Sequence, residues 1–157
     1  MKTIKCKNNY GNIVELPFGK FEKRLSVYAI LRRDDCVLMC KNRSNGKLWL
    51  PGGGIDSGET NEQVLRRECL EETGISDIRI NKLLAEYQNY FYYEPEDLAM
   101  DGYLYFYECE TDQEQVKLNN EIDDGEAIDF QWLKISQIAK EDLCDLNDEI
   151  YNLLNSL

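Results

Sequence analysis

Apolar residues in the first fifty positions occur in short runs separated by turn-forming residues, a pattern typical of β-strands. Two of these runs flank Asn8-Asn9-Tyr10-Gly11, whose composition predicts the turn of a hairpin. Two longer runs flank the charged residues 32–35 and are expected to pair with each other. The strands predicted in this half of the chain are 4–7, 13–16, 25–31, 36–40 and 48–50.

Residues 60–73 carry the clearest helical pattern, and both of its ends are marked. Thr60 is suited to the N-cap, and Gln63 follows three residues later as the second residue of a capping box. Gly74 is suited to the left-handed position that ends a helix. One helix is therefore expected between two groups of strands.

Segments rich in aromatic residues follow this helix and predict further strands at 78–87, 89–93, 103–109 and 128–133. A final helix is predicted from apolar residues three to four positions apart, namely Leu143, Leu146, Ile150, Leu153 and Leu157. This order favours an α/β/α or α+β sandwich with a mixed sheet over a strictly alternating βαβ fold. Because we see no repeat or linker, we expect one domain over residues 1–157.

Composition narrows the class of protein. Of the 157 residues 43% are hydrophobic and 31% charged, which is typical of a folded globular chain. We find neither a signal peptide nor an apolar stretch approaching the roughly 20 residues that cross a bilayer, so a cytoplasmic protein without a membrane partner is expected. The six cysteines are scattered without a CxxC pair and are interpreted as reduced core residues.

Charge and the absence of histidine exclude several chemistries. Without histidine there is no Ser-His-Asp or Cys-His nucleophile and no histidine-ligated zinc. A formal net charge of −12 without a basic stripe argues against nucleic acid as a partner. An anionic ligand would have to be held through a divalent cation.

Three glutamates on the middle helix are candidates for holding that cation. At about 100° per residue, Glu68, Glu71 and Glu72 fall within about a quarter turn. A solvated acidic face is the ordinary explanation of such a pattern. Val64 and Leu65 share the arc, however, which favours carboxylates that face the protein and are brought together by a metal. Carboxylate oxygens alone select hard ions, Mg²⁺ first and Mn²⁺ next.

The residues around these glutamates resemble the signature of the Nudix hydrolases. Gly53 is followed after five residues by Glu59 and after seven more by Arg67-Glu68-Cys69-Leu70-Glu71-Glu72-Thr73-Gly74-Ile75. The preceding Trp49-Leu50-Pro51-Gly52-Gly53 is similar to the way the family enters this loop. Cys69 stands where the family usually has an aliphatic residue, and its small apolar side chain should preserve the packing.

The resemblance implies an α/β fold, a Nudix-type α/β/α sandwich with a mixed β-sheet, here with an N-terminal hairpin. It also implies hydrolysis of the diphosphate bond in a small nucleoside diphosphate derivative by metal-activated water, with Mg²⁺ as cofactor and Mn²⁺ as a substitute. The metal ligands that it implies are Glu68, Glu71, Glu72 and Gly53, with Glu59 and Arg67 in support.

Other residues are assigned less directly by the same resemblance. Arg43 is similar to a residue that meets substrate phosphate, with Lys41 or Lys47 as weaker candidates. The general base stays open between Glu68, Glu71 and the downstream loop acid Glu126. A homodimer is also expected, because relatives are often dimers.

Alternatives to the enzyme are a nucleotide or ADP-ribose sensor without catalysis and, in the same fold, an isoprenoid diphosphate isomerase. The intact glutamates argue against the first, and the missing histidine ligands argue against the second. The aromatic residues of 87–107 are interpreted mainly as sheet packing, although some could stack on a base. Apart from the Nudix signature, we find no motif that indicates which nucleotide derivative is the substrate.

Overall fold

The computed structural model of the chain describes residues 1–114, 116 and 127–157. The strands are β1 (Thr3–Asn8), β2 (Ile13–Pro17), β3 (Phe21–Arg33), β4 (Cys36–Asn42), β5 (Leu48–Trp49), β6 (Gly52–Gly54), β7 (Arg79–Tyr93), β8 (Leu98–Glu110) and β9 (Ala127–Lys134). The helices are α1 (Asn61–Thr73) and α2 (Asn147–Asn155).

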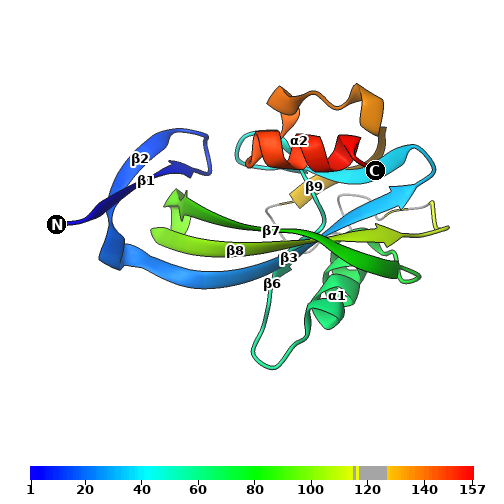
Figure 1. The fold of residues 1–157 in the computed structure, drawn as a ribbon, viewed down its shortest axis with the longest axis horizontal. Coiled ribbons are helices and arrows are strands. Elements are labelled where there is room, and N and C mark those ends of the chain that lie inside the picture. The colour runs from blue at the N-terminus through cyan, green and yellow to red at the C-terminus, as the bar shows by residue number, and fades with distance from the viewer. Residues whose placement is uncertain (115, 117–126) are drawn as a thin grey trace.

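One mixed sheet joins these strands in the order β2-β1-β7-β8-β3-β4-β5, with β6 paired to β3 and β9 to β4. Two pairs are parallel, β1 with β7 and β3 with β8. Helix α1 lies on one side of the sheet and α2 on the other, and the β1–β2 hairpin lies at the end of the sheet where the chain begins (Figure 1). The predicted α/β/α sandwich with an N-terminal hairpin is confirmed.

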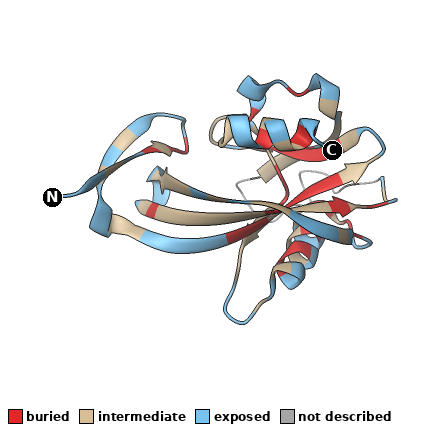
Figure 2. Ribbon diagram, in the orientation of Figure 1, coloured by how far each residue is buried: buried red, intermediate tan, exposed pale blue. Residues whose placement is uncertain are grey.

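Strand β3 is the centre of the core, because helices cover both of its faces. Val27, Ala29 and Leu31 pack with residues of α1, whereas Ile30 packs with α2 through Ile150. This explains why the sequence shows a continuous apolar run instead of alternation. Burial is concentrated where the two helices flank the sheet, while the half of β3, β7 and β8 toward the hairpin is more exposed (Figure 2).

The ends of α1 match the predicted capping. The hydroxyl of Thr60 accepts a hydrogen bond from the backbone N–H of Gln63 at 3.2 Å, and the Gln63 side chain accepts one from the Thr60 N–H at 2.8 Å. Gly74 ends the helix at φ +75°. The local sequence therefore fixes the length of this helix and the direction in which its residues project.

Two predicted elements were wrong in detail. Residues 79–93 form one long strand instead of two, because Gln88 projects to the exposed face and donates to Asp101 at 2.7 Å without interrupting the pairing. The last helix begins only at Asn147, since Leu146 adopts a left-handed conformation at φ +45°. Leu143 is buried instead just after a short 3-10 turn (Lys140–Asp142), where it forms an isolated bridge with Leu48 of β5.

Cysteine burial largely agrees with the interpretation of core thiols. Cys6, Cys40, Cys69 and Cys109 are buried, Cys36 and Cys144 are half-buried, and all six are free. Burial raises the pKa of the Cys109 thiol to about 12, so it stays protonated at neutral pH. Within the described residues, no helix combines the length and apolar character that a bilayer crossing requires.

Candidate active site

A short glycine strand enters the sheet where two longer strands separate. β3 and β4 pair only at Arg32 with Val37 and at Arg33 with Cys36, and they diverge beyond this turn. β6 lies beside β3 further along, opposite residues 26–28, and is joined to α1 by residues 55–60. The glycine strand therefore lies between the central strand and the helix that carries the glutamates.

Each glycine of β6 lies so close to a neighbouring group that an added side chain would collide with it. A β-carbon on Gly52, whose φ is +144°, would lie 2.2 Å from the carbonyl oxygen of Val27. On Gly53 it would lie 2.6 Å from Oε1 of Glu68. Close approach of the backbone to a neighbouring group is a common reason for glycine, and here one of those groups is a candidate metal ligand.

The three glutamates of α1 do not lie in equivalent places. Glu68 and Glu72 line a groove together with the glycine strand, and a carboxylate oxygen of Glu72 accepts a hydrogen bond from the N–H of Gly52 at 3.0 Å. The Glu68 side chain is only 16% exposed. That of Glu71 is 60% exposed, so the prediction that all three face the protein was wrong for Glu71.

The reason is the position of the packed face of α1. Besides Val64 and Leu65, Cys69 and Thr73 are also buried. At about 100° per residue, with Val64 at 0°, including them moves the mean direction of this face from about 50° to about 105°. That direction is about 25° from Glu72 and about 125° from Glu71. The packed face predicted from Val64 and Leu65 alone was therefore centred too close to Glu71.

Arg67 holds the loop and the helix together. Its guanidinium donates to both oxygens of Glu59, at 2.7 and 2.9 Å, and to Glu68 at 2.8 Å. It also lies 3.5 Å from Glu71. The hydrogen bonds from Arg67 lower the pKa of Glu59 to about 2, and donation to the Glu59 and Glu68 carboxylates raises the pKa of Arg67. The contacts fix the orientation of the Glu68 carboxylate from outside the groove.

The oxygen donors around the groove suit a hard divalent cation. Glu68 and Glu72 supply carboxylates, with the Gly53 carbonyl and Glu71 as further candidates. Mg²⁺ typically takes one or two carboxylates and keeps several waters and substrate oxygens. Among the described residues, no three Cys, Asp or Glu side chains are already gathered at metal-binding distance. The site therefore fits an ion that is bound together with its water and substrate.

The groove has a volume of about 410 Å³ and uses one face of the sheet as its floor. Alternate residues of β3 line it, namely Arg24, Ser26 and Tyr28, as do alternate residues of β7, namely Asn89, Phe91 and Tyr93. Other aromatic residues pack within the sheet, such as Tyr87 against Phe106, with ring centroids 5.8 Å apart. The aromatic strands thus contribute both to packing and to the groove.

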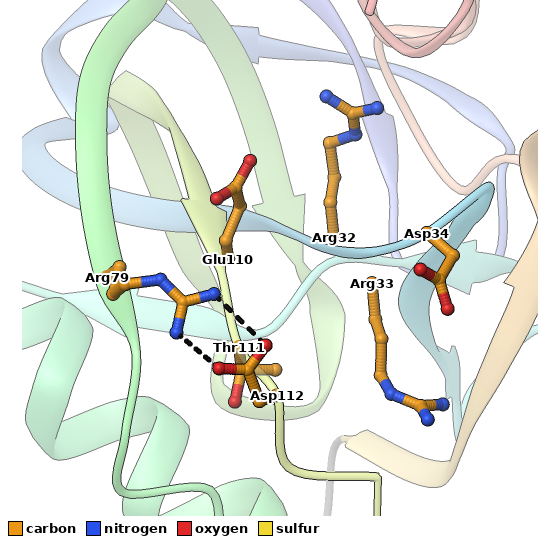
Figure 3. A pocket seen from close by; sticks show the side chains of 7 residues that line it. All are labelled: Arg32, Arg33, Asp34, Arg79, Glu110, Thr111 and Asp112. Carbon is orange, nitrogen blue, oxygen red and sulfur yellow. Dashed lines mark hydrogen bonds and ion pairs between the residues drawn. The ribbon is translucent and has the colours of Figure 1, made fainter.

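A second hollow of about 420 Å³ lies at the other end of β3 and is lined by three arginines (Figure 3). Each of them is paired with an acidic side chain. Arg79 donates to Asp112 at 3.0 and 3.4 Å, and the other two arginines pair with Glu108 and Glu114. Since these charges are balanced within the protein, we assign the substrate to the groove.

Comparison with known proteins identifies the family. The NUDIX domain pattern matches residues 22–154, which is most of the chain. This chain belongs to the Nudix family. The matched region begins in β3, so the β1–β2 hairpin precedes it.

Named relatives of this Nudix hydrolase differ in their substrates. "Nucleoside triphosphatase NudI" of Salmonella newport (strain SL254) is 28% identical over 130 residues, 77% of this chain and 89% of the relative. The structure of a MutT NUDIX hydrolase from Burkholderia pseudomallei has a TM-score of 0.63 at 18% identity and covers 87% of this chain and 98% of its own. An ADP-ribose pyrophosphatase from Streptococcus suis 89-1591 has a TM-score of 0.61 at 16% identity, covering 85% and 90%.

The remaining predicted residues of the Nudix site are scattered. Arg43 is exposed in the loop after β4 and does not line the groove, and Lys47 donates to the carbonyl of Glu141 at 2.7 Å. Lys41 lies 4.0 Å from Asp129. Glu126 lies outside the described residues.

Arg24 was not among the predicted site residues. It lines the groove from β3, next to Gly54, where an added β-carbon would lie 3.0 Å from an Arg24 guanidinium nitrogen. The alternation of Arg24, Ser26 and Tyr28 along a strand was available as a signal. It was overlooked because the strand was taken to begin at Leu25, whereas it begins at Phe21.

Proposed function

We propose that this Nudix hydrolase is a Mg²⁺-dependent pyrophosphohydrolase that cleaves the diphosphate bond of a small nucleoside diphosphate derivative. One observation carries the proposal: a single groove is lined by the carboxylates of Glu68 and Glu72, the glycine strand and the guanidinium of Arg24. Oxygen donors for a cation thus lie beside a positive charge for a phosphate, as hydrolysis of a polyanion by an acidic protein requires.

Each side chain has a separate task in this proposal. Glu68, Glu72, Glu71 and the Gly53 carbonyl would hold the cation. When bound, the cation supplies charge neutralisation of the diphosphate and a lower pKa for a coordinated water. Arg67 keeps Glu68 oriented through the hydrogen bond at 2.8 Å.

The substrate phosphate and the proton each need a further group. Arg24 would bind the phosphate that lies away from the cation, and Arg43 stays a candidate for a phosphate beyond the rim of the groove. The proton from water would go to Glu68 or Glu71, or to Glu126, which lies outside the described residues.

Turnover of a nucleotide panel tests this function directly. We expect hydrolysis of at least one nucleoside triphosphate, nucleotide sugar, dinucleoside polyphosphate, NADH or ADP-ribose, about 100-fold faster with Mg²⁺ than with EDTA. Nucleoside triphosphates come first, because of the named nucleoside triphosphatase relative. Thermal stabilisation by a nucleotide without any product would instead favour the sensor, and absence of turnover with every compound would rule out the enzyme proposal.

Arginine variants should separate the two phosphate candidates. Arg24→Ala is expected to lower kcat/KM about 10- to 100-fold, mainly through KM, because a guanidinium–phosphate contact is charge-assisted. Arg43→Ala, which also removes an exposed arginine, is expected to change kcat/KM less than about threefold. A larger effect of Arg43→Ala would transfer the phosphate role to Arg43. Steady-state kinetics on the best panel compound measure both.

The expectations of a cytoplasmic location and of a homodimer stay predictions. Sedimentation velocity of the purified chain tests the second.

A further inference from the structure

A hydrogen-bonded pair of polar side chains lines the groove on the side of β7. The amide of Asn89 donates through Nδ2 to Oδ2 of Asp145, the residue just before Leu146 and α2. Oδ1 of Asp145 accepts the backbone N–H of Leu146 at 2.8 Å. Both side chains line the groove. Two segments 56 residues apart in the chain therefore fix a carboxylate and an amide in a defined orientation.

This pair lies across the sheet from the phosphate candidate. Asn89 is directly opposite Gly102 of β8, and Gly102 is directly opposite Arg24 of β3. With neighbouring strands about 4.8 Å apart, Asn89 and Arg24 are separated by about 10 Å of groove floor. Gly102 itself carries no side chain, and the Leu104 side chain lies beside it, since an added β-carbon on Gly102 would be 3.2 Å from Leu104 Cδ1. A nucleoside placed along this floor would bring its phosphates to Arg24 and its base to the pair.

Apolar and aromatic side chains elsewhere in the groove suit a planar ring. Phe91 and Leu104 line the groove beside Asn89 and Gly102. Trp49 lines it from β5 and is held in place by edge contact with Tyr28, with ring centroids 5.4 Å apart. Apolar and aromatic walls with a few placed polar groups are typical of small-molecule sites, and the polar groups determine which ligand is accepted.

The pair offers more acceptors than donors. An ionised carboxylate accepts about four hydrogen bonds, of which the described residues supply two to Asp145. Asn89 has given one N–H to Asp145, which leaves its second N–H as the donor of the pair. Burial raises the pKa of Asp145, although the Leu146 and Asn89 donors oppose that rise. A partly buried carboxyl group with spare acceptor capacity gains most from a ligand that brings N–H donors.

We propose that Asn89 and Asp145 bind the base of a guanine nucleotide. Of the common nucleobases, guanine presents two adjacent donors, N1–H and N2–H, on the same edge as an acceptor, O6. The Asp145 carboxylate accepts the two donors, and the second N–H of Asn89 donates to O6. Adenine, cytosine and uracil each place an acceptor against the carboxylate at one of these positions. The inference rests on the proposed function only in assuming that the phosphates lie toward the glycine strand.

The test compares the 5′-triphosphates of guanosine, adenosine, cytidine, uridine and xanthosine. With the wild-type protein and Mg²⁺, we expect kcat/KM for guanosine triphosphate to exceed that for the other three common nucleotides about 10- to 100-fold. Asp145→Asn keeps the shape but replaces an acceptor by a donor. It should lower the guanosine value by a similar factor and raise the xanthosine value relative to guanosine, because xanthine has an oxygen in place of the N2 amino group.

Glu149→Gln is the matched control, since Glu149 is an exposed carboxylate of α2 that acts on Asp145 only through its charge. It should leave the order of the five nucleotides unchanged. Asn89→Ala provides a second variant if Asp145→Asn does not fold, and it should reduce the guanosine preference about 10-fold.

Binding is measured alongside turnover, by thermal stabilisation with each nucleotide. Preferential stabilisation by guanosine triphosphate without hydrolysis would support the base site while contradicting the proposed enzyme. Hydrolysis with no guanosine preference in either measurement would overturn the base site and leave the enzyme intact. A guanosine preference that Asp145→Asn and Asn89→Ala both fail to change would overturn the assignment to these residues.

Discussion

Glu72→Gln is expected to lower kcat with Mg²⁺ about 1,000-fold on whichever panel nucleotide is hydrolysed fastest. Loss of one carboxylate from the cation site removes several kcal/mol of transition-state stabilisation, and about 4 kcal/mol corresponds to this factor. The amide oxygen of the new side chain can still accept the Gly52 N–H that Glu72 now accepts at 3.0 Å. The fold should therefore be retained, and the effect should appear in kcat and not in the melting temperature.

Glu62→Gln is the control on the same helix. Glu62 is exposed and pairs with Arg66 at 2.9 Å on the face of α1 away from the groove. Its replacement should change kcat less than about twofold, since an exposed i,i+4 ion pair contributes little. A Glu72→Gln protein that keeps more than a tenth of the wild-type kcat would show that Glu72 does not hold the cation.

Gly52→Ala is expected to lower the free energy of unfolding by about 4 kcal/mol, the largest stability effect of any substitution in β6. The added β-carbon would lie 2.2 Å from the Val27 carbonyl oxygen and 2.7 Å from Tyr28 Cα, and backbone atoms of a central strand cannot move aside. The φ of +144° also disfavours any residue with a side chain. Urea unfolding followed by circular dichroism measures the change.

Gly53→Ala, one residue further on, should behave differently. Its β-carbon would meet the end of the Glu68 side chain, which can rotate away, so the expected loss of stability is about 1 kcal/mol. The displaced carboxylate should nevertheless lower kcat about 100-fold, because Glu68 is a candidate metal ligand. For Gly52→Ala, unfolding at the same urea concentration as the wild type would contradict the close approach of Gly52 to the Val27 carbonyl oxygen.

The parts of the fold that could be predicted are those set by neighbours in the sequence. The capping box of Thr60 and Gln63 and the glycine at position 74 determine α1 through hydrogen bonds within four residues. The turn after Asn8 and the apolar runs around residues 32–35 determine their hairpins in the same way. The spacing of Glu68 and Glu72 on one helix face also follows from helix geometry alone.

What could not be predicted depended on contacts between distant segments. Glu71 was predicted to face inward because only Val64 and Leu65 were used to define the packed face of α1. The tertiary structure shows that Cys69 and Thr73 belong to that face as well. Arg43 is exposed because it lies in the loop after β4. Arg24 differs from these cases, because its alternation with Ser26 and Tyr28 was visible in the sequence and only the start of the strand was misplaced. Leu143 was taken for a helix residue, but it forms a bridge with Leu48 of β5 and lies outside α2.

By itself the sequence determined the family, the capped helix, the acidic residues available to a cation and the need for glycine before them. These features depend on residue types at fixed short spacings, for which backbone geometry and hydrogen bonding suffice. Only the tertiary structure decided which carboxylates reach the groove, which arginine lines it, and that Asn89 and Asp145 meet although they are 56 residues apart in the chain. Such meetings are set by the order of strands in the sheet and by the packing of α2, which no local pattern encodes.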